Sequence, residues 1–128
     1  MDEVNDIVSD ASGSIYVTGS TSSVNFPVTA EAYDTSLGGG RDAFVAKFDS
    51  DGTLTWSTLL GGPNDDRGYA VKVDQTGNVY VAGGAGVDYP TTAGALQSAF
   101  AGDINPDPAF GAQDGFITKL SPNGSQIV

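Results

Sequence analysis

The chain lacks two residue types on which much protein chemistry depends, because it has no cysteine and no histidine. Without cysteine there is no disulfide, no thiolate zinc site and no cysteine nucleophile. Without histidine the commonest general base and transition-metal ligand are missing, and a serine–histidine–aspartate triad is excluded. We therefore expect no catalysis by this chain.

Basic residues are also scarce, at 5 against 16 carboxylates, which gives a net charge of −11. Nucleic acids and anionic lipids need basic patches for affinity, so neither is expected as a partner. No run of about 18 apolar residues is present, so no membrane insertion is expected. The acidic start, Met1-Asp2-Glu3, lacks the basic and apolar regions of a signal peptide. This leaves two readings, a cytosolic protein or an excised piece of a longer chain.

Glycine, by contrast, is abundant, with 18 residues in a chain of 128, about twice the usual ~7%. Serine, threonine and asparagine are plentiful too, which is typical of many short strands joined by many turns. Because 39% of the residues are hydrophobic, the chain is not expected to be disordered.

The chain also repeats itself. The phrase Asp10–Gly19 (DASGSIYVTG) returns 64 residues later as Asp74–Gly83 (DQTGNVYVAG), and Asp42–Lys47 (DAFVAK) returns 72 residues later as Asp114–Lys119 (DGFITK). A repeat of this kind is one supersecondary unit that cannot bury its apolar face alone. Neighbouring units are therefore expected to stack.

Each repeat is predicted to contain four strands. The strand candidates are Asp6–Asp10, Ser14–Gly19, Ala43–Phe48 and Thr53–Leu60 in the first repeat, and Tyr69–Asp74, Asn78–Gly83, Gly115–Leu120 and a strand only begun at Ser125–Val128 in the second. The turns Asp10–Gly13 and Asp74–Gly77 are expected to be tight hairpins, in which Asp bonds its own backbone and Gly accepts positive φ.

A long excursion separates the second and third strands of each repeat, at Ser20–Arg41 and at Gly84–Gln113. Both contain an aromatic–proline pair, Phe26-Pro27 and Tyr89-Pro90. The second carries about eight more residues, as an insertion near 103–111. Because strand direction alternates, the hairpin turns are expected at one end of each unit and the excursions at the other.

Four-stranded antiparallel units in tandem, joined by glycine-rich turns, are typical of β-propeller blades. We therefore predict an all-β fold with about two blades per chain. Residues 1–62 form the first repeat, and residues 63–128 form the second, with its insertion and an incomplete last strand.

The chain resembles the bacterial SBBP repeat, the seven-bladed β-propeller repeat of secreted and surface proteins. The phrases that carry this resemblance are Gly77–Gly83 (GNVYVAG), Asn25–Pro27 (NFP), Gly40–Lys47 (GRDAFVAK) and Leu54–Gly62 (LTWSTLLGG). The resemblance implies propeller blades in an exported bacterial protein, located outside the cell or at its surface. It implies no reaction and no catalytic residues.

Two blades are too few for a closed propeller, which typically has about four to eight. Two blades alone would expose large apolar sheet faces, which soluble monomers avoid. We therefore expect a non-catalytic structural or interaction module that is completed by further blades or by identical chains, for example as a trimer or a tetramer.

Acidic clusters suggest one cofactor, calcium, which is coordinated by six to eight oxygen ligands. Asp49–Gly52 resembles the start of a calcium loop but lacks the later ligands, and its alternative is an ordinary hairpin turn. A second candidate set offers more oxygens on one face and comprises Asp65, Asp66, Asp103 and Asp107, together with Asn64 and Asn105. The alternative for this second set is a solvated acidic loop.

Aromatic residues give the remaining candidates. Trp56 is expected to pack between blades. The excursions carry further aromatic residues that could bind a glycan or a protein ligand, namely Phe26, Tyr33, Tyr89 and Phe110. Their alternative role is to anchor each excursion onto its blade. Two other functions therefore stay open: a carbohydrate- or protein-binding module, and a fragment of a propeller enzyme such as a glycosidase that uses paired carboxylates.

Overall fold

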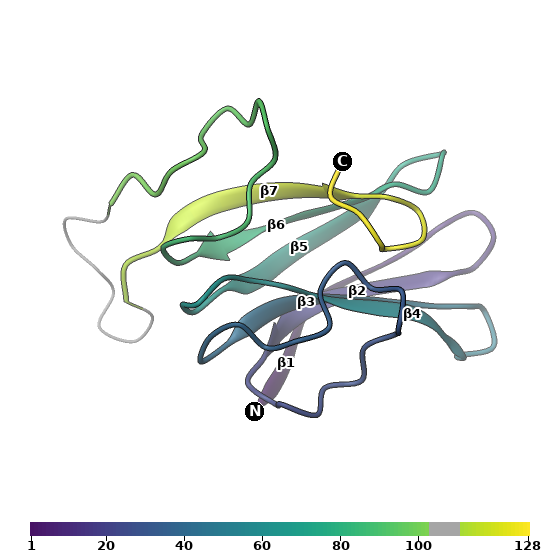
Figure 1. The fold of residues 1–128 in the computed structure, drawn as a ribbon. Helices are drawn as coiled ribbons and strands as arrows, with labels where there is room; N and C mark the ends of the chain where they lie inside the picture. Colours follow the sequence, from purple (N-terminus) through teal and green to yellow (C-terminus); the bar gives the residue numbers. More distant parts are fainter. Residues whose placement is uncertain (103–110) are drawn as a thin grey trace.

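In the computed structural model, which describes residues 1–102 and 111–128, the chain forms two antiparallel β-sheets stacked face to face (Figure 1). The first sheet has the order β1-β2-β3-β4, and the second has the order β5-β6-β7. The predicted all-β architecture of two propeller-blade sheets is confirmed. None of the described residues forms a helix that could cross a membrane.

The strands lie close to the predicted ranges. Their bounds are β1 Asp2–Ser9, β2 Ile15–Thr21, β3 Asp42–Phe48, β4 Leu54–Leu60, β5 Arg67–Val73, β6 Val79–Ala85 and β7 Asp114–Leu120. β1 begins earlier than expected, at Asp2, because a bulge between Val4 and Asp6 lets its polar first residues pair with the far end of β2. Only a bridge between Leu120 and Ile127 marks the fourth position of the second sheet.

The tight turns that join neighbouring strands lie at one end of both sheets, at the right of Figure 1. In the first of them the Asp10 carboxylate accepts the backbone N–H groups of Ser12 and Ser14, at 2.9 and 3.0 Å. Gly13 has a φ of +84°, and its counterpart Gly77 has +86°. These positive angles suit glycine, which has no Cβ to clash with the backbone. The predicted Asp-x-x-Gly hairpins are therefore confirmed.

The hydrophobic core lies between the two sheets. The inner face of the first sheet carries Tyr16, Thr18, Ala43, Val45, Trp56, Thr58 and Leu60, and the inner face of the second carries Val71, Val79, Val81 and Leu120. Each of these side chains is at most 6% exposed. Strand alternation sends every second side chain to this layer.

Trp56 joins the two units. Its indole N–H donates to the carbonyl of Pro122 in the last turn of the second sheet, at 3.0 Å. Its ring meets the ring of Tyr16 edge-on, with centroids 6.5 Å apart. The expectation that Trp56 packs between blades is confirmed.

The first excursion closes the free edge of the first sheet. The Thr29 N–H donates to the Ser57 carbonyl at 3.1 Å, and the Leu59 N–H donates to the Asp34 carbonyl at 3.0 Å. The excursion therefore satisfies backbone groups of β4 that would otherwise stay unpaired, a common way to protect an edge strand.

Candidate functional site

Each sheet has an outer face that the other sheet does not cover. The outer face of the first sheet carries Ile7, Ile15, Val17, Phe44 and Phe48, as the strand registers require. Ile7 is 62% exposed, whereas its counterpart in the second repeat, Val71, is fully buried against the first sheet. At this position the apolar residue that builds the core in one unit is therefore presented to solvent in the other.

The outer face of the second sheet shows the converse. It carries Lys72, Tyr80, Ala82, Ile117 and Lys119. Ile117 is 82% exposed, whereas its counterpart Val45 is fully buried at the contact between the sheets. The two outer faces thus correspond to the two inner faces that already pack together within the chain.

A tyrosine–lysine pair occurs on both sheets. The Lys47 ammonium lies 5.3 Å from the ring centroid of Tyr16, and Lys119 lies 5.5 Å from that of Tyr80. Each tyrosine also donates its hydroxyl to the aspartate of the neighbouring hairpin, Tyr16 to Asp10 at 3.0 Å and Tyr80 to Asp74 at 3.2 Å. In the first sheet this pair faces the second sheet, and Tyr16 is only 1% exposed.

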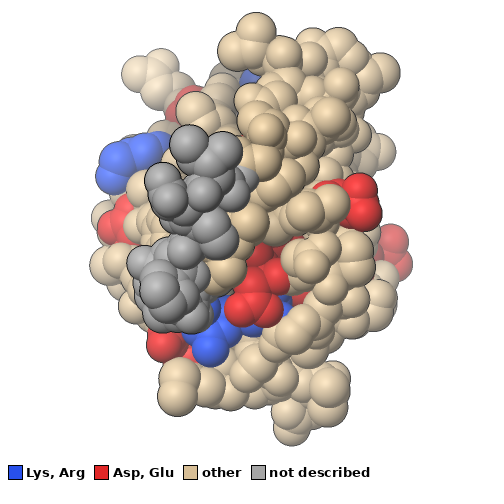
Figure 2. Space-filling model, turned by 90° about the vertical axis from the view of Figure 1, so that its left-hand side faces the viewer, with Lys and Arg blue, Asp and Glu red and all other residues tan. Residues whose placement is uncertain are grey.

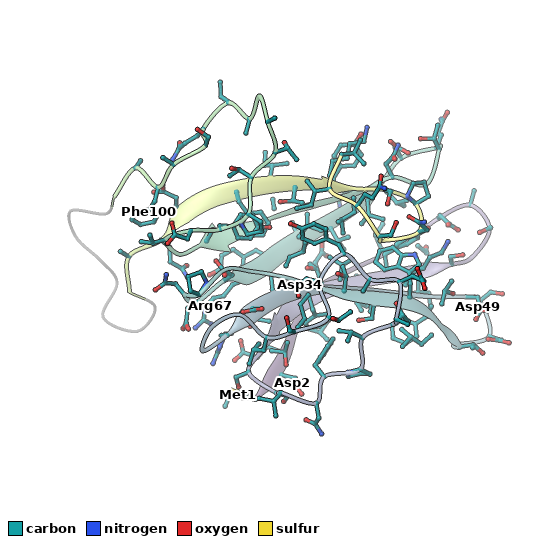
Figure 3. The ribbon with its side chains drawn as sticks, viewed as in Figure 1. Met1, Asp2, Asp34, Asp49, Arg67 and Phe100 are labelled. Atoms are coloured by element: carbon teal, nitrogen blue, oxygen red, sulfur yellow. The ribbon has the colours of Figure 1, made fainter. Side chains whose placement is uncertain are left out.

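A third feature is a groove of about 820 Å³ beside β7, called here the strand groove. One wall is β7 itself, with Phe116, Ile117 and Thr118, and the other is the second excursion, with Thr92, Leu96 and Gln97. Figure 1 shows the segment that follows β6 rising alongside β7. In Figure 3 Phe100, which also lines the groove, lies at the same end of the molecule as Arg67 and far from the hairpin residue Asp49.

Two of the predicted ligand-binding aromatics anchor the excursions. The ring of Tyr89 stacks on Phe116 with centroids 4.4 Å apart, and the ring of Phe26 lies 4.6 Å from that of Phe44. The Tyr89 hydroxyl also shares a 2.9 Å hydrogen bond with the Thr118 hydroxyl. Burial raises the pKa of Tyr89 well above its usual value. The anchoring role is therefore realised, and a ligand-binding role for these two rings stays a prediction.

The other two predicted aromatics are Tyr33 and Phe110. Tyr33 is 36% exposed, and its backbone N–H donates to the carbonyl of Gly124 in the second unit at 3.0 Å. Tyr33 therefore sits at the junction between the units. Phe110 lies outside the described residues.

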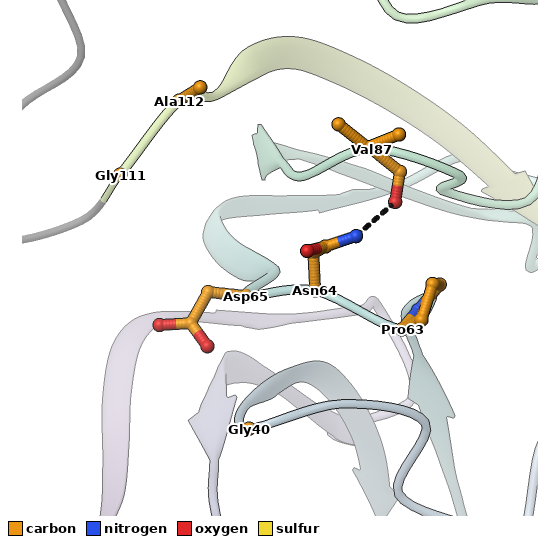
Figure 4. Close-up of a pocket in the computed structure, with 7 residues that line it drawn as sticks. All are labelled: Gly40, Pro63, Asn64, Asp65, Val87, Gly111 and Ala112. Atoms are coloured by element: carbon orange, nitrogen blue, oxygen red, sulfur yellow. Dashed lines mark hydrogen bonds between the residues drawn. The ribbon is translucent and has the colours of Figure 1, made fainter.

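Two of the candidate calcium residues, Asp65 and Asp66, lie in the linker between the sheets. A pocket of about 460 Å³ there is lined by Gly40, Pro63, Asn64, Asp65, Val87, Gly111 and Ala112 (Figure 4). The Asn64 side-chain amide donates to the Val87 carbonyl at 2.9 Å, and among the described lining residues Asp65 supplies a carboxylate. Asp103 and Asp107 lie outside the described residues.

Asp66 does not share this pocket. It is fully buried and accepts two backbone N–H groups, from Gly62 at 2.7 Å and from Gly86 at 2.8 Å. It thereby clamps the linker to the start of the second excursion. Burial raises its pKa to about 6, although these two hydrogen bonds act in the opposite direction.

Arginines lie beside the exposed carboxylates of the same region. Arg41 and Arg67 lie 3.5 and 3.8 Å from Glu3, and Arg67 lies 3.9 Å from Asp65. Figure 2, which views the molecule from this side, shows positive and negative side chains next to one another. Within residues 1–102 and 111–128 no group of three acidic side chains is arranged to hold a metal ion. Calcium binding stays a prediction.

The turn Asp49–Gly52 forms an ordinary hairpin. The carboxylates of Asp49 and Asp51 both accept the backbone N–H of Thr53, at 3.0 and 2.9 Å. This is the local side-chain-to-backbone bonding by which Asp stabilises turns.

Ile7 and Ile117, exposed apolar residues of the two outer faces, are not among the predicted site residues. The signal was present, because each has a counterpart in the other repeat, Val71 and Val45. What the sequence alone did not show is that only one member of each pair is covered.

Comparison with known proteins agrees with this architecture. Residues 55–90, which run from β4 to the start of the second excursion, match the family model of the SBBP β-propeller repeat. The chain is also similar to the regulatory protein FlaEY of Caulobacter vibrioides, with 31% identity over 102 residues. That alignment covers 68% of this chain but only 11% of the relative, so the chain corresponds to a small part of that protein. The chain thus carries an SBBP β-propeller repeat, and its two sheets are propeller-blade sheets.

Proposed function

We propose that the chain is a non-catalytic stacking module, which assembles head to tail with other sheets of its own kind. The observation that carries this proposal is the contact inside the chain, where the inner face of the first sheet packs on the inner face of the second. The outer face of each sheet carries the positions that are equivalent to the inner face of the other sheet. A second copy can therefore place the outer face of its first sheet on the outer face of the second sheet.

The change in burial between equivalent positions supports this arrangement. Ile7 and Ile117 are 62% and 82% exposed, and their counterparts are fully buried. Ile7 lies on the outer face of the first sheet and Ile117 on that of the second, so each outer face presents an exposed apolar side chain to a stacking partner. Contact between unlike faces is heterologous, so such copies either close into a ring or form an open array.

The proposal includes the surroundings that the family resemblance implies, a secreted or cell-surface protein in which neighbouring blades or identical chains complete the propeller. Regulation is named for the relative FlaEY and not for this chain.

The test uses two charge substitutions, Ile7→Asp on the outer face of the first sheet and Ile117→Asp on that of the second. The solution mass of each variant and of the unaltered chain is measured by light scattering after size exclusion. The unaltered chain is expected to exceed the mass of one chain, and each variant alone to fall toward a monomer. Mixed in equal amounts, the two variants are expected to form a one-to-one dimer, because each retains the face that the other lacks.

Val24→Asp is the matched control, since Val24 is 91% exposed and lies on the first excursion, outside the strands that form the two outer faces. This variant should associate like the unaltered chain. A monomeric unaltered chain at high concentration, or a mixture of the two variants that stays monomeric, would refute head-to-tail stacking.

A further inference from the structure

We propose that Asn123 is a site of spontaneous chemical modification, which the contact between the two units holds back and which, once modified, keeps that contact from re-forming. The site lies in the turn Ser121–Gly124, which follows β7. The contact is inside one chain, so this site does not rest on stacking between copies.

The chain has one asparagine that is followed directly by glycine, and it is Asn123. Asparagine is a chemically labile residue. In such a pair the glycine nitrogen can attack the side-chain amide carbon, because glycine has no Cβ to shield its nitrogen or to restrict its backbone. The attack forms a bond from the Gly124 nitrogen to Asn123 Cγ and breaks the Cγ–Nδ2 bond. Ammonia leaves with the proton of the Gly124 N–H, and a cyclic succinimide remains.

Water then opens this ring and balances the reaction. Cleavage of the bond between the glycine nitrogen and Cγ gives aspartate. Cleavage of the bond between that nitrogen and the main-chain carbonyl carbon of residue 123 gives isoaspartate, whose main chain runs through Cγ and is longer by a methylene group. The reaction requires no enzyme and no reactant other than water.

In the folded chain both reacting groups are already engaged. The Gly124 N–H donates to the Ser121 carbonyl at 2.9 Å. The Asn123 side-chain oxygen accepts the hydroxyls of Ser121 and Ser125, at 2.7 and 2.9 Å. The turn must therefore open before the glycine nitrogen can reach Cγ.

Residues of the first unit cover this turn. The Trp56 indole N–H donates to the Pro122 carbonyl at 3.0 Å, and the Tyr33 N–H donates to the Gly124 carbonyl, also at 3.0 Å. Gly124 is buried, and a Cβ built on it would collide with the indole. Opening the turn therefore requires the contact between the two units to open as well.

The equivalent turn of the first repeat has the same local hydrogen bond but no such cover. The Gly52 N–H donates to the Asp49 carbonyl at 3.0 Å, yet Gly52 is exposed and a Cβ built on it would meet nothing within 4 Å. Asp51 occupies the position of Asn123 there. The two turns therefore differ in their cover and not in the hydrogen bond that closes them.

Modification should make the opening permanent. Isoaspartate inserts a methylene group into the main chain beside Gly124, where even a Cβ would collide with Trp56. The two carbonyls that bind the first unit, those of Pro122 and Gly124, lie on either side of this insertion. The longer main chain should not bring both acceptors to their present positions, so this end of the contact is expected to stay open.

The test places a second asparagine–glycine pair in the same chain by the substitution Asp51→Asn. The two pairs have closely matched surroundings in the sequence, because serine follows one and threonine follows the other. The folded chain is incubated at neutral pH, and deamidation at positions 51 and 123 is measured by mass spectrometry of the peptides. Position 123 should react about tenfold more slowly, since two additional hydrogen bonds must break. In concentrated urea the two positions should react at similar rates.

Trp56→Phe tests the role of the contact, because phenylalanine keeps an aromatic ring but lacks the indole N–H. Combined with Asp51→Asn, it should accelerate deamidation at position 123 and leave position 51 unchanged. Equal acceleration at both positions would attribute the reaction to unfolding of the whole chain and overturn control by the contact. Equal rates at the two positions in the folded Asp51→Asn chain, or no reaction at position 123 in urea, would overturn the proposal as well.

Asn123→Asp is the control for the permanent effect, because it carries the new carboxylate on an ordinary main chain. The isoaspartate product is purified after reaction of the unaltered chain in urea and is then refolded. Its Tyr33 amide should exchange with solvent faster than in the unaltered chain, whereas Asn123→Asp should keep the slow exchange of that amide. Slow Tyr33 exchange in both proteins would contradict a contact that modification keeps open.

Discussion

At the scale of single residues, the same turn occurs twice but in two different settings. Gly52 and Gly124 close the equivalent turns after β3 and β7, with φ angles of +88° and +69°. A Cβ at Gly52 would meet nothing within 4 Å, whereas a Cβ at Gly124 would collide with the indole of Trp56. A substitution at either glycine would strain the backbone, but only a substitution at Gly124 would also collide with Trp56.

We therefore expect Gly52→Ala to lower the free energy of unfolding by about 1–2 kcal/mol, from the left-handed backbone alone. Gly124→Ala should cost about 1–3 kcal/mol more, because Trp56 is packed and cannot move without disturbing its neighbours. Urea denaturation of both variants measures the difference. Equal losses would show that Trp56 does not pack on the second turn in solution.

Aspartates of the chain should titrate in two different ranges. The Asp66 carboxyl is expected at a pKa of about 6 because it is buried, and that of Asp10 at about 2 because Ser12 and other groups hydrogen-bond its charged form. Carbon-13 NMR of the carboxyl groups against pH measures both midpoints. An Asp66 midpoint near the ordinary 3.8 would contradict the burial of this carboxyl.

The effect of Asp66 on stability follows from the same shift. Its folded pKa lies above the unfolded value, so the folded chain binds more protons between about pH 4 and pH 6. The contribution of this group is therefore fully present below about pH 4 and is lost as the pH rises through 6. Asp66→Asn cannot ionise, so its unfolding free energy should lack this fall, although it starts lower because the amide offers one acceptor oxygen to two N–H donors.

At the scale of elements, one hydroxyl of β4 contributes to holding the first excursion. The fully buried Thr58 hydroxyl accepts the Asp34 N–H at 2.9 Å and lies 3.3 Å from the Asp34 carbonyl. Thr58→Val keeps the shape but leaves that N–H without its acceptor, which should cost about 1–3 kcal/mol. Amide exchange of Asp34 should also become faster.

Thr55→Val is the control for this change, because Thr55 lies on the same strand but is exposed. It should leave both the stability and the Asp34 amide almost unchanged. Similar losses in the two variants would point to a general effect on β4 instead of release of the excursion.

The strands could be predicted well from the sequence, because residues typical of turns mark where they begin and end. The Asp-x-x-Gly phrases located the hairpins, and the repeat offsets located the third strands across excursions of different length. The strand groove could not be predicted, since it depends on how the second excursion folds back beside β7. The roles of Phe26 and Tyr89 were left open for the same reason, and their contacts with Phe44 and Phe116 show that they anchor the excursions, while ligand binding by these rings stays a prediction.

The position of Asp66 shows another limit of the sequence. In the sequence it is one of two adjacent aspartates, and both are equally good calcium candidates. The structure separates them, because Asp66, just before β5, turns inward to two backbone N–H groups, whereas Asp65 stays at the surface. A pattern of acidic residues in the sequence does not show which carboxylates will accept hydrogen bonds from the backbone.

At the scale of the whole molecule, stacking should make stability depend on protein concentration. Association that requires folded faces stabilises the folded chain by mass action. The melting temperature of the unaltered chain should therefore rise as its concentration is raised a hundredfold, and that of Ile7→Asp should not. Calorimetric scans at the two concentrations make the comparison, and a melting temperature that is independent of concentration in both would argue against association.

The hydrogen bond from Trp56 to Pro122 has a consequence for the order of events during synthesis. A ribosome releases the chain from its N-terminus, so all four strands of the first sheet emerge well before the turn that receives the indole. Until then the inner face of the first sheet has no cover, and its apolar side chains are open to wrong partners. The first sheet can pair its strands early, but it reaches its final packing only when residue 122 has left the tunnel.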